Sequence, residues 1–185
     1  MNQKCAKGFR FHIGMRNIKT AIAATLCALI YILFLNHRDP TFACIGAIFG
    51  MGSDMADSKL NGGNRLFGTV FGGLIGMGLY YIYLQVYPDG RYHALILLLL
   101  FIGVVILVLT SLGVGWPGAI QPGGVVLCIL LFTQKTDTFV SYSLNRIFDT
   151  AFGVIVAILI NILFPRDRVV RWLQKLGIRK LDERE

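Results

Sequence analysis

Long apolar runs alternate with short polar stretches along almost the whole chain. A helix that crosses the roughly 30 Å hydrocarbon core of a membrane needs about 20 predominantly apolar residues. Runs of this kind recur from one end of the chain to the other, and the pattern predicts an all-α, polytopic membrane protein with six transmembrane helices. The expected segments are about 18–35, 40–52, 66–86, 94–112, 114–132 and 147–164.

The second and fifth segments differ from the other four. Residues 40–52 are rich in Gly and Ala and fall below the usual spanning length. The fifth segment carries Pro117, Pro122 and several glycines, so its first half is expected to be broken or kinked. Interrupted backbone is tolerated in a membrane where it lines a polar cavity, which favours a substrate pathway. Close helix packing through Gly and Ala is the alternative for the second segment.

An internal repeat divides the chain into two similar halves. Residues 64–72 (Asn-Arg-Leu-Phe-Gly-Thr-Val-Phe-Gly) align without gaps to residues 145–153 (Asn-Arg-Ile-Phe-Asp-Thr-Ala-Phe-Gly), at an offset of 81 residues. Each copy is expected at the start of the third helix of a three-helix unit. Because three is an odd number, the second unit enters the membrane from the opposite side. The repeat therefore predicts two inverted three-helix repeats, an architecture common in secondary transporters.

Composition excludes a soluble protein. Of the 185 residues, 55% are hydrophobic and 15% are charged, and the mean hydropathy is +0.65, which lies outside the range of soluble domains. Six helices would leave no room for a separate catalytic or nucleotide-binding domain. The expected organisation is a basic interfacial segment at 1–17, a six-span membrane domain at 18–165 with repeat halves at about 18–86 and 94–165, and a basic amphipathic cytoplasmic tail at 166–185.

The net charge of +8 is concentrated near the two ends of the chain. Nucleic-acid binding is not expected, because these basic residues flank apolar spans as the positive-inside rule and anionic headgroups require. With the N-terminus inside, fourteen lysines and arginines lie on the cytoplasmic side and four lie outside. The expected location is a bacterial inner membrane, with both termini cytoplasmic.

No arrangement of residues indicates an enzyme. The three histidines stand alone and the four cysteines form no close pair, so no catalytic set, metal site or bound cofactor is expected. The spacing Gly68-x-x-x-Gly72-x-x-x-Gly76 lies inside an apolar segment without a preceding strand. It predicts a helix-packing face rather than a phosphate loop. Close packing on this face, together with the small number of helices, predicts a homodimer.

Two arginines, Arg65 and Arg146, occupy the same position in the two copies of the repeat. If one enters from each side of the membrane, their guanidinium groups offer planar sets of N–H donors to a passing anion. The alternative is that each arginine snorkels from a helix end to headgroups or water at little cost. Thr69 and Thr150 also match in the repeat and join the arginines as candidate substrate-binding residues.

The sixth segment carries small and polar residues four apart on one face, namely Asp149, Gly153, Ala157 and Asn161. Such a stripe is expected to face protein or a water-filled cavity, so Asp149 and Asn161 are further candidates. Asp149 is one turn from Arg146, and an ion pair within the helix explains it as well as substrate or proton handling does. Gln121, in the interrupted fifth segment, is expected to cap broken backbone or to contact substrate.

Three stretches resemble the membrane domain of the aromatic acid exporter family, which is related to fusaric-acid-resistance-type proteins and plant aluminium-activated malate transporters. They are residues 14–21, the Asn64-Arg65-x-x-Gly68-Thr69-x-x-Gly72 motif, and the Arg146-x-x-Asp149-Thr150-x-x-Gly153 motif that ends in Asn161-x-x-Phe164-Pro165. The resemblance covers about residues 10–167. It implies six spans and the export or conduction of organic anions by a dimer. Many relatives add a sizeable cytoplasmic domain after the sixth span, where this chain has a short tail.

The leading expectation is a transporter, either exporter or channel, for organic and particularly aromatic carboxylate anions. The alternative is a non-transporting membrane scaffold or subunit that acts with a partner protein. A polar cavity bounded by the second, third, fifth and sixth segments would favour transport. A bundle closed throughout by Leu, Phe and Ile would favour the scaffold.

Overall fold

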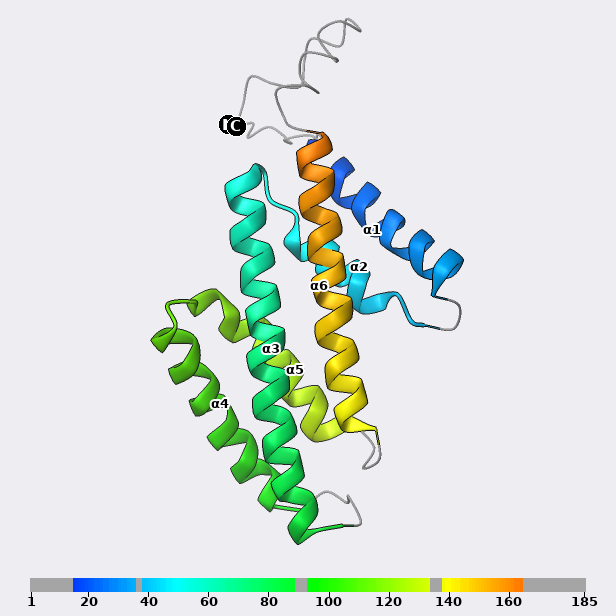
Figure 1. Ribbon diagram of the computed structural model, residues 1–185. Coiled ribbons are helices and arrows are strands. Elements are labelled where there is room, and N and C mark those ends of the chain that lie inside the picture. Colours follow the sequence, from blue (N-terminus) through cyan, green and yellow to red (C-terminus); the bar gives the residue numbers. More distant parts are fainter. Residues whose placement is uncertain (1–14, 36–37, 89–92, 134–137, 165–185) are drawn as a thin grey trace, which may run out of the picture.

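The structure is a computed structural model that describes residues 15–35, 38–88, 93–133 and 138–164. The described part is all-helical (Figure 1). The predicted tail at 166–185, and nearly all of the predicted N-terminal segment at 1–17, lie outside the described residues. The elements are α1 (Met15–Phe34), α2 (Thr41–Gly50), α3 (Met55–Val86), α4 (Leu95–Gly113), a 3₁₀ turn η1 (Pro117–Ala119), α5 (Ile120–Thr133) and α6 (Phe139–Leu163).

Four of these helices, α1, α3, α4 and α6, are long and apolar enough to cross a membrane. α2 has 10 residues and α5 has 14. At about 1.5 Å per residue they extend only about 15 and 21 Å, so neither spans a bilayer by itself. The second apolar segment is therefore short, as predicted.

The fifth segment is interrupted, which confirms the prediction of a break. Gly115 has a φ of 78°, a conformation that is accessible to glycine and strained for other residues. Pro117 then begins η1. α5 continues regularly past Pro122, because a proline near the first turn of a helix removes no intrahelical hydrogen bond.

α3 and α6 begin earlier than predicted. α3 starts at Met55 because Asp54 caps it, and the Asp54 side chain accepts a 2.8 Å hydrogen bond from the backbone N–H of Asp57. α6 starts at Phe139. The added turns contain many polar residues and so give a weak hydropathy signal. Arg65 and Arg146 consequently lie about three and two turns inside their helices, and the prediction that each begins a helix is wrong.

The two long helices α3 and α6 run antiparallel through the middle of the bundle and contact each other (Figure 1). α1 and α2 pack against α6, while α4 and α5 pack against α3. Two apolar cores result. One lies between α1, α2 and α6 around Tyr31 and Ala157, and the other lies between α3, α4 and α5 around Tyr83 and Leu127. Each core joins the first two helices of one predicted half to the third helix of the other half.

Glycines bring the short helices against the backbone of the long ones. A Cβ atom at Gly153 of α6 would collide with a backbone carbonyl of α2, and one at Gly72 of α3 would collide with a backbone carbonyl of α5. Cβ atoms at Gly68 and Gly76 would also meet α5. The predicted packing face on the third helix is confirmed, and its partner is α5 of the same chain.

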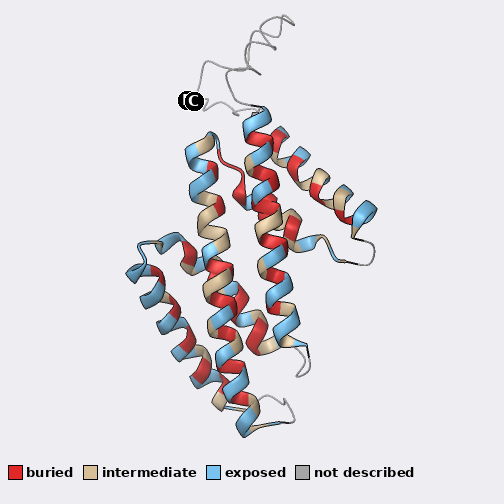
Figure 2. Ribbon diagram, viewed as in Figure 1, coloured by how far each residue is buried: buried red, intermediate tan, exposed pale blue. Residues whose placement is uncertain are grey.

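Exposed positions follow the outer sides of α1 and α4 (Figure 2), and many of them carry large apolar side chains. They include Phe34, Leu98, Phe101 and Leu109, each more than half exposed. An apolar surface of this extent is unusual in water. It suits helices whose outer faces contact lipid.

Candidate functional site

Four of the residues predicted as candidates are buried on α6. Arg146, Asp149, Thr150 and Asn161 are between 1% and 6% exposed. Lipid offers no hydrogen-bond partners, so polar side chains on a membrane helix must find partners in the protein, in water or on a ligand. Which partners each of them has therefore decides what role it can take.

Arg146 contacts aromatic side chains. Its Nη1 donates a 2.6 Å hydrogen bond to the hydroxyl oxygen of Tyr142, and its guanidinium carbon lies 3.2 Å from the centre of the Phe42 ring in α2. An aromatic face attracts a cation, so these contacts place the guanidinium group inside the bundle. Its Nε atom is buried and has no hydrogen-bond partner among the described residues. A snorkelling side chain would be exposed, so this geometry does not fit the snorkelling alternative for Arg146.

Arg65 approaches the same region from α3. Its guanidinium carbon lies 5.5 Å from the centre of the Phe49 ring in α2, and its Nε atom is also buried without a partner within the described ranges. Both guanidinium groups thus lie beside α2, Arg65 reaching it from α3 and Arg146 from α6. Like charges are costly to bring together in a low-dielectric interior. An anion bound beside α2 would offset the cost of placing two positive charges there.

Two hydroxyl groups near Arg146 add further unpaired polar atoms. Thr150 Oγ1 and Ser143 Oγ are buried and have no hydrogen-bond partner in the part of the chain that the structure describes. Thr69 differs from its repeat counterpart Thr150, because its hydroxyl donates a 2.9 Å hydrogen bond to the backbone carbonyl of Arg65. The polar atoms that remain available to a ligand therefore lie mainly on α6.

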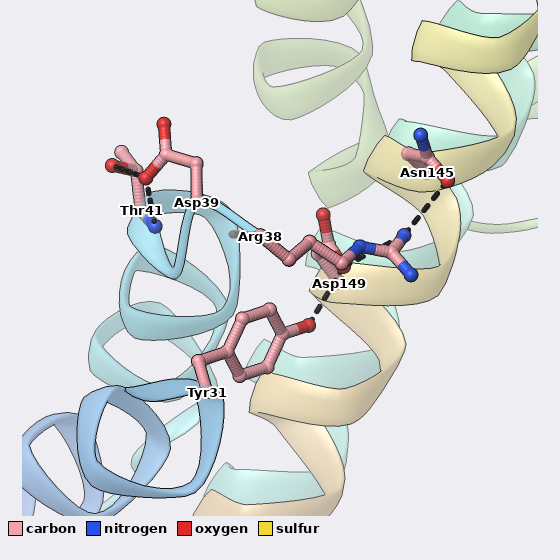
Figure 3. Close-up of polar contacts among 6 residues, drawn as sticks. All are labelled: Tyr31, Arg38, Asp39, Thr41, Asn145 and Asp149. Atoms are coloured by element: carbon pink, nitrogen blue, oxygen red, sulfur yellow. Dashed lines mark hydrogen bonds and ion pairs between the residues drawn. The ribbon is translucent and has the colours of Figure 1, made fainter. Parts of the chain in front are cut away.

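Asp149 lies where α6 meets α1 and the link between α1 and α2 (Figure 3). Its Oδ1 accepts a 2.7 Å hydrogen bond from the hydroxyl of Tyr31 and lies 3.1 Å from Nη2 of Arg38. The same Nη2 donates a 2.8 Å hydrogen bond to Oδ1 of Asn145. The ion-pair partner of Asp149 is thus Arg38, from another element, in place of the intrahelical partner Arg146 that the spacing suggested.

A second carboxylate in this link, Asp39, points to Thr41 (Figure 3). Its Oδ1 accepts hydrogen bonds from the backbone N–H of Thr41 at 2.9 Å and from the Thr41 hydroxyl at 2.5 Å. These two bonds hold the pKa of the Asp39 carboxyl below its ordinary value. Asp39 is therefore ionised at neutral pH, and its bonds to Thr41 fix the backbone at the start of α2.

Asn161 connects three parts of the chain. Its Oδ1 accepts a 3.0 Å hydrogen bond from Nζ of Lys19 in α1. Its Nδ2 donates to the backbone carbonyl of Asp54 at 2.7 Å and to the hydroxyl oxygen of Ser58 at 2.9 Å. Ser58 Oγ also accepts a bond from the backbone N–H of Gly52. Both the oxygen and the nitrogen of the Asn161 amide have hydrogen-bond partners. This geometry indicates that Asn161 links α1, α3 and α6.

Sequence reasoning did not single out Tyr31 and Arg38, which the structure brings to Asp149. Tyr31 is hard to single out from the sequence, because it is one hydroxyl-bearing residue within an apolar run. Arg38 follows that run, and its charge was the signal that could have identified it. Gln121 is exposed on α5, and the structure does not gather it with the buried candidates of α6. Within the described residues, no group of three or more His, Cys, Asp or Glu side chains is placed to hold a metal ion.

The comparison with known proteins gives one match. No curated protein and no solved structure matches the chain. The family model for aromatic acid exporter family member 1 matches residues 11–164, a range that includes all six helices and every candidate residue. This match confirms the family resemblance that the sequence motifs predicted. The chain therefore belongs to the aromatic acid exporter family.

Proposed function

We propose that the protein exports organic carboxylate anions, aromatic acids in particular, and that Arg65 and Arg146 bind the carboxylate between α2, α3 and α6. One observation carries this proposal. Two guanidinium groups from matching repeat positions lie against aromatic rings of α2, and each has a buried Nε atom without a hydrogen-bond partner among the described residues. A carboxylate supplies both the negative charge and the acceptor oxygens that these groups lack.

The surroundings of the two arginines suit an aromatic acid. Phe42 and Phe49 of α2 lie beside Arg146 and Arg65 respectively, and Tyr142 lies edge-on to Phe42 with ring centres 6.2 Å apart. Aromatic rings prefer edge-on or offset contacts with other rings. A bound aromatic acid would direct its carboxylate to the guanidinium groups and its ring to these side chains.

The proposal includes two inverted repeats. In each half the second crossing is made only partly by a short helix, α2 or α5, and the two short helices start from opposite faces of the membrane. The support for this arrangement is the matching pattern of contacts, since α2 packs on α6 as α5 packs on α3. Short helices that end inside the membrane are typical of binding sites in transporters with inverted repeats. The site then lies beside α2, between the two long helices.

The orientation gives a prediction about accessibility. In a bacterial inner membrane with cytoplasmic termini, Asp39 lies outside and Ser53 lies inside, and both side chains are exposed. In a variant without the native cysteines, a membrane-impermeant thiol reagent added to intact cells should label Asp39→Cys and not Ser53→Cys. The reverse labelling pattern would overturn the proposed topology.

We also propose that the protein acts as a homodimer, because one chain offers few helices to enclose a pathway. The glycines at 68, 72 and 76 were expected to permit that contact. They pack against α5 of the same chain instead, so a second copy would have to contact an exposed apolar face.

Efflux from proteoliposomes tests the function. Vesicles loaded with 4-hydroxybenzoate at about pH 8, where carboxylic acids are ionised and leak slowly, should release it about tenfold faster with the protein than without it. Release should saturate with concentration. The neutral amide of the same compound is the matched control and should leave at the same rate with and without protein, because it lacks the charge that the arginines bind.

The scaffold alternative makes the opposite prediction. If folded protein gives no release of 4-hydroxybenzoate, or of any other carboxylate in a panel, above that of protein-free vesicles, the transport proposal fails. Two arginines that lie beside α2 with unpartnered buried Nε atoms favour transport over a scaffold, because a packing role does not need like charges in the interior.

A further inference from the structure

The cluster around Asp149 contains Tyr31 and Arg38, which both contact its carboxylate. These two donors are typical of a carboxylate-binding site, and the Asp149 carboxylate occupies it. We propose that Tyr31 and Arg38 form a second binding site for the exported carboxylate, and that Asp149 occupies this site as an internal ligand when no anion is present. This inference rests on the proposed function, because it concerns the same anion on its way through the protein.

The donors are those that recognise a carboxylate. The Tyr31 hydroxyl donates to Asp149 Oδ1 at 2.7 Å and Arg38 Nη2 approaches the same oxygen at 3.1 Å, so one oxygen receives a hydroxyl and a charged donor. The Arg38 guanidinium carbon lies 5.0 Å from the centre of the Phe148 ring. A hydroxyl, a guanidinium and a nearby aromatic face together match an aromatic acid.

Arg38 remains accessible from outside the cluster. Its side chain is 32% exposed, whereas that of Asp149 is 6% exposed. Its contacts with Asp149 and Asn145 both use Nη2. An arginine has five N–H donors, so an incoming carboxylate can approach the exposed side of Arg38 before Asp149 leaves.

The other repeat has no carboxylate at the position that matches Asp149. The matching residue of the other repeat is Gly68, whose helix packs closely against α5. The α4–α5 link there places Trp116 on Phe67, with ring centres 4.6 Å apart, where the first link places Arg38 over Phe148. One half therefore has two stacked aromatic side chains where the other has a guanidinium over a ring, and the ion pair of Arg38 with Asp149 has no counterpart in the other half.

The two sites are adjacent on α6. Arg146 and Asp149 are three residues apart, which corresponds to a rise of about 4.5 Å along the helix. An anion bound at Arg146 therefore needs to move about one helical turn to replace Asp149 on Arg38. Displacement exchanges one carboxylate for another at Arg38, so the charge of the ion pair is conserved during the transfer.

Binding of 4-hydroxybenzoate to the purified full-length protein, measured by calorimetry, tests this inference. Asp149→Asn removes the internal carboxylate and keeps the side-chain shape, so the dissociation constant should fall about tenfold. Loss of a negative charge near Arg146 could by itself raise affinity. The double variant Asp149→Asn with Arg38→Gln separates these causes, because only a site on Arg38 predicts that the gain disappears.

Asp39→Asn is the matched control. It removes an ionised carboxylate from the same link and keeps an oxygen that accepts from Thr41. Affinity should stay within about twofold of that of the wild type, because Asp39 does not occupy Arg38. An equal gain in Asp39→Asn and Asp149→Asn would overturn the second site and indicate a general effect of charge.

The outcomes for the two proposals differ. If the wild type binds and exports the anion but Asp149→Asn binds it no more tightly, the second site is wrong and the proposed function stands. If the gain survives in the double variant, the second site is also wrong. If neither the wild type nor Asp149→Asn binds the anion, both proposals fail.

A second variant covers the case in which Asp149→Asn does not fold. Arg38→Gln alone changes a partly exposed residue, and we expect it to slow export about fivefold while affinity at Arg65 and Arg146 stays within about twofold. Unchanged export by folded Arg38→Gln protein would overturn the second site.

Discussion

Replacing Arg146 by lysine is expected to reduce carboxylate export at least about tenfold while the protein still inserts and folds. Lysine keeps the positive charge but lacks the planar guanidinium that lies on Phe42 and donates to Tyr142. It also cannot present two parallel N–H donors to a carboxylate. The measurement is efflux of 4-hydroxybenzoate from proteoliposomes, with folding checked by size-exclusion chromatography.

Arg65→Lys is expected to reduce export in the same way, because its guanidinium is the second donor of the pair. The matched control is Arg16→Lys on α1. Arg16 donates a single 3.1 Å hydrogen bond from Nη2 to the backbone carbonyl of Met51, which a lysine ammonium can replace. Export by this variant should stay within about twofold of that of the wild type.

Two results would contradict the role of these arginines. Full export by both lysine variants would exclude a carboxylate site that depends on guanidinium geometry. Loss of folding in both variants, with Arg16→Lys intact, would assign Arg65 and Arg146 to contacts between helices.

Much of the fold could be predicted because a membrane restricts the backbone to a few solutions. Apolar runs in lipid must form helices, since no other open structure satisfies their backbone groups there. The short second segment, the break near Gly115 and the packing role of Gly72 also follow from local chemistry. In each case the residue limits its own backbone or the approach of a neighbour, whatever the rest of the chain does.

Helix starts were harder to predict because hydropathy loses its signal in polar turns. The turns from Met55 to Arg65 contain charged and amide side chains, but they remain helical because Asp54 caps them. The Asp54-x-x-Asp57 spacing was the available sign of a helix start. Missing it placed Arg65 at a helix end, where snorkelling appeared as good an explanation as ligand binding.

The partner of Asp149 could not be predicted from spacing. Arg146 is three residues away, and helical geometry makes such pairs neighbours. In the structure Arg146 contacts Phe42 and Tyr142, while Asp149 contacts Arg38 and Tyr31. This choice depends on how α1 and α2 pack on α6, which is tertiary information. A local pattern indicates which residues can interact, and packing decides which of them do.

The glycines where short and long helices cross should be the positions most sensitive to an added methyl group. Gly72→Ala and Gly153→Ala each place a Cβ against a backbone carbonyl of the neighbouring helix. The backbone cannot rotate away as a side chain can, so the helices must separate. Overpacking usually costs about 1–3 kcal/mol and more at a rigid contact, so we expect a large fall in the melting temperature of the purified protein.

Gly78→Ala on α3 is the matched control for this prediction. A Cβ at Gly78 meets no atom within 4 Å, and alanine favours a helix over glycine by about 1 kcal/mol. This variant should be as stable as the wild type or more so. If the Gly72→Ala and Gly153→Ala proteins melt at the same temperature as Gly78→Ala, then α3 does not cross α5, and α6 does not cross α2, as closely as the structure describes. Parallel losses at 72 and 153, with 78 unaffected, would show that α2 and α5 make equivalent contacts with the two long helices, as inverted repeats require.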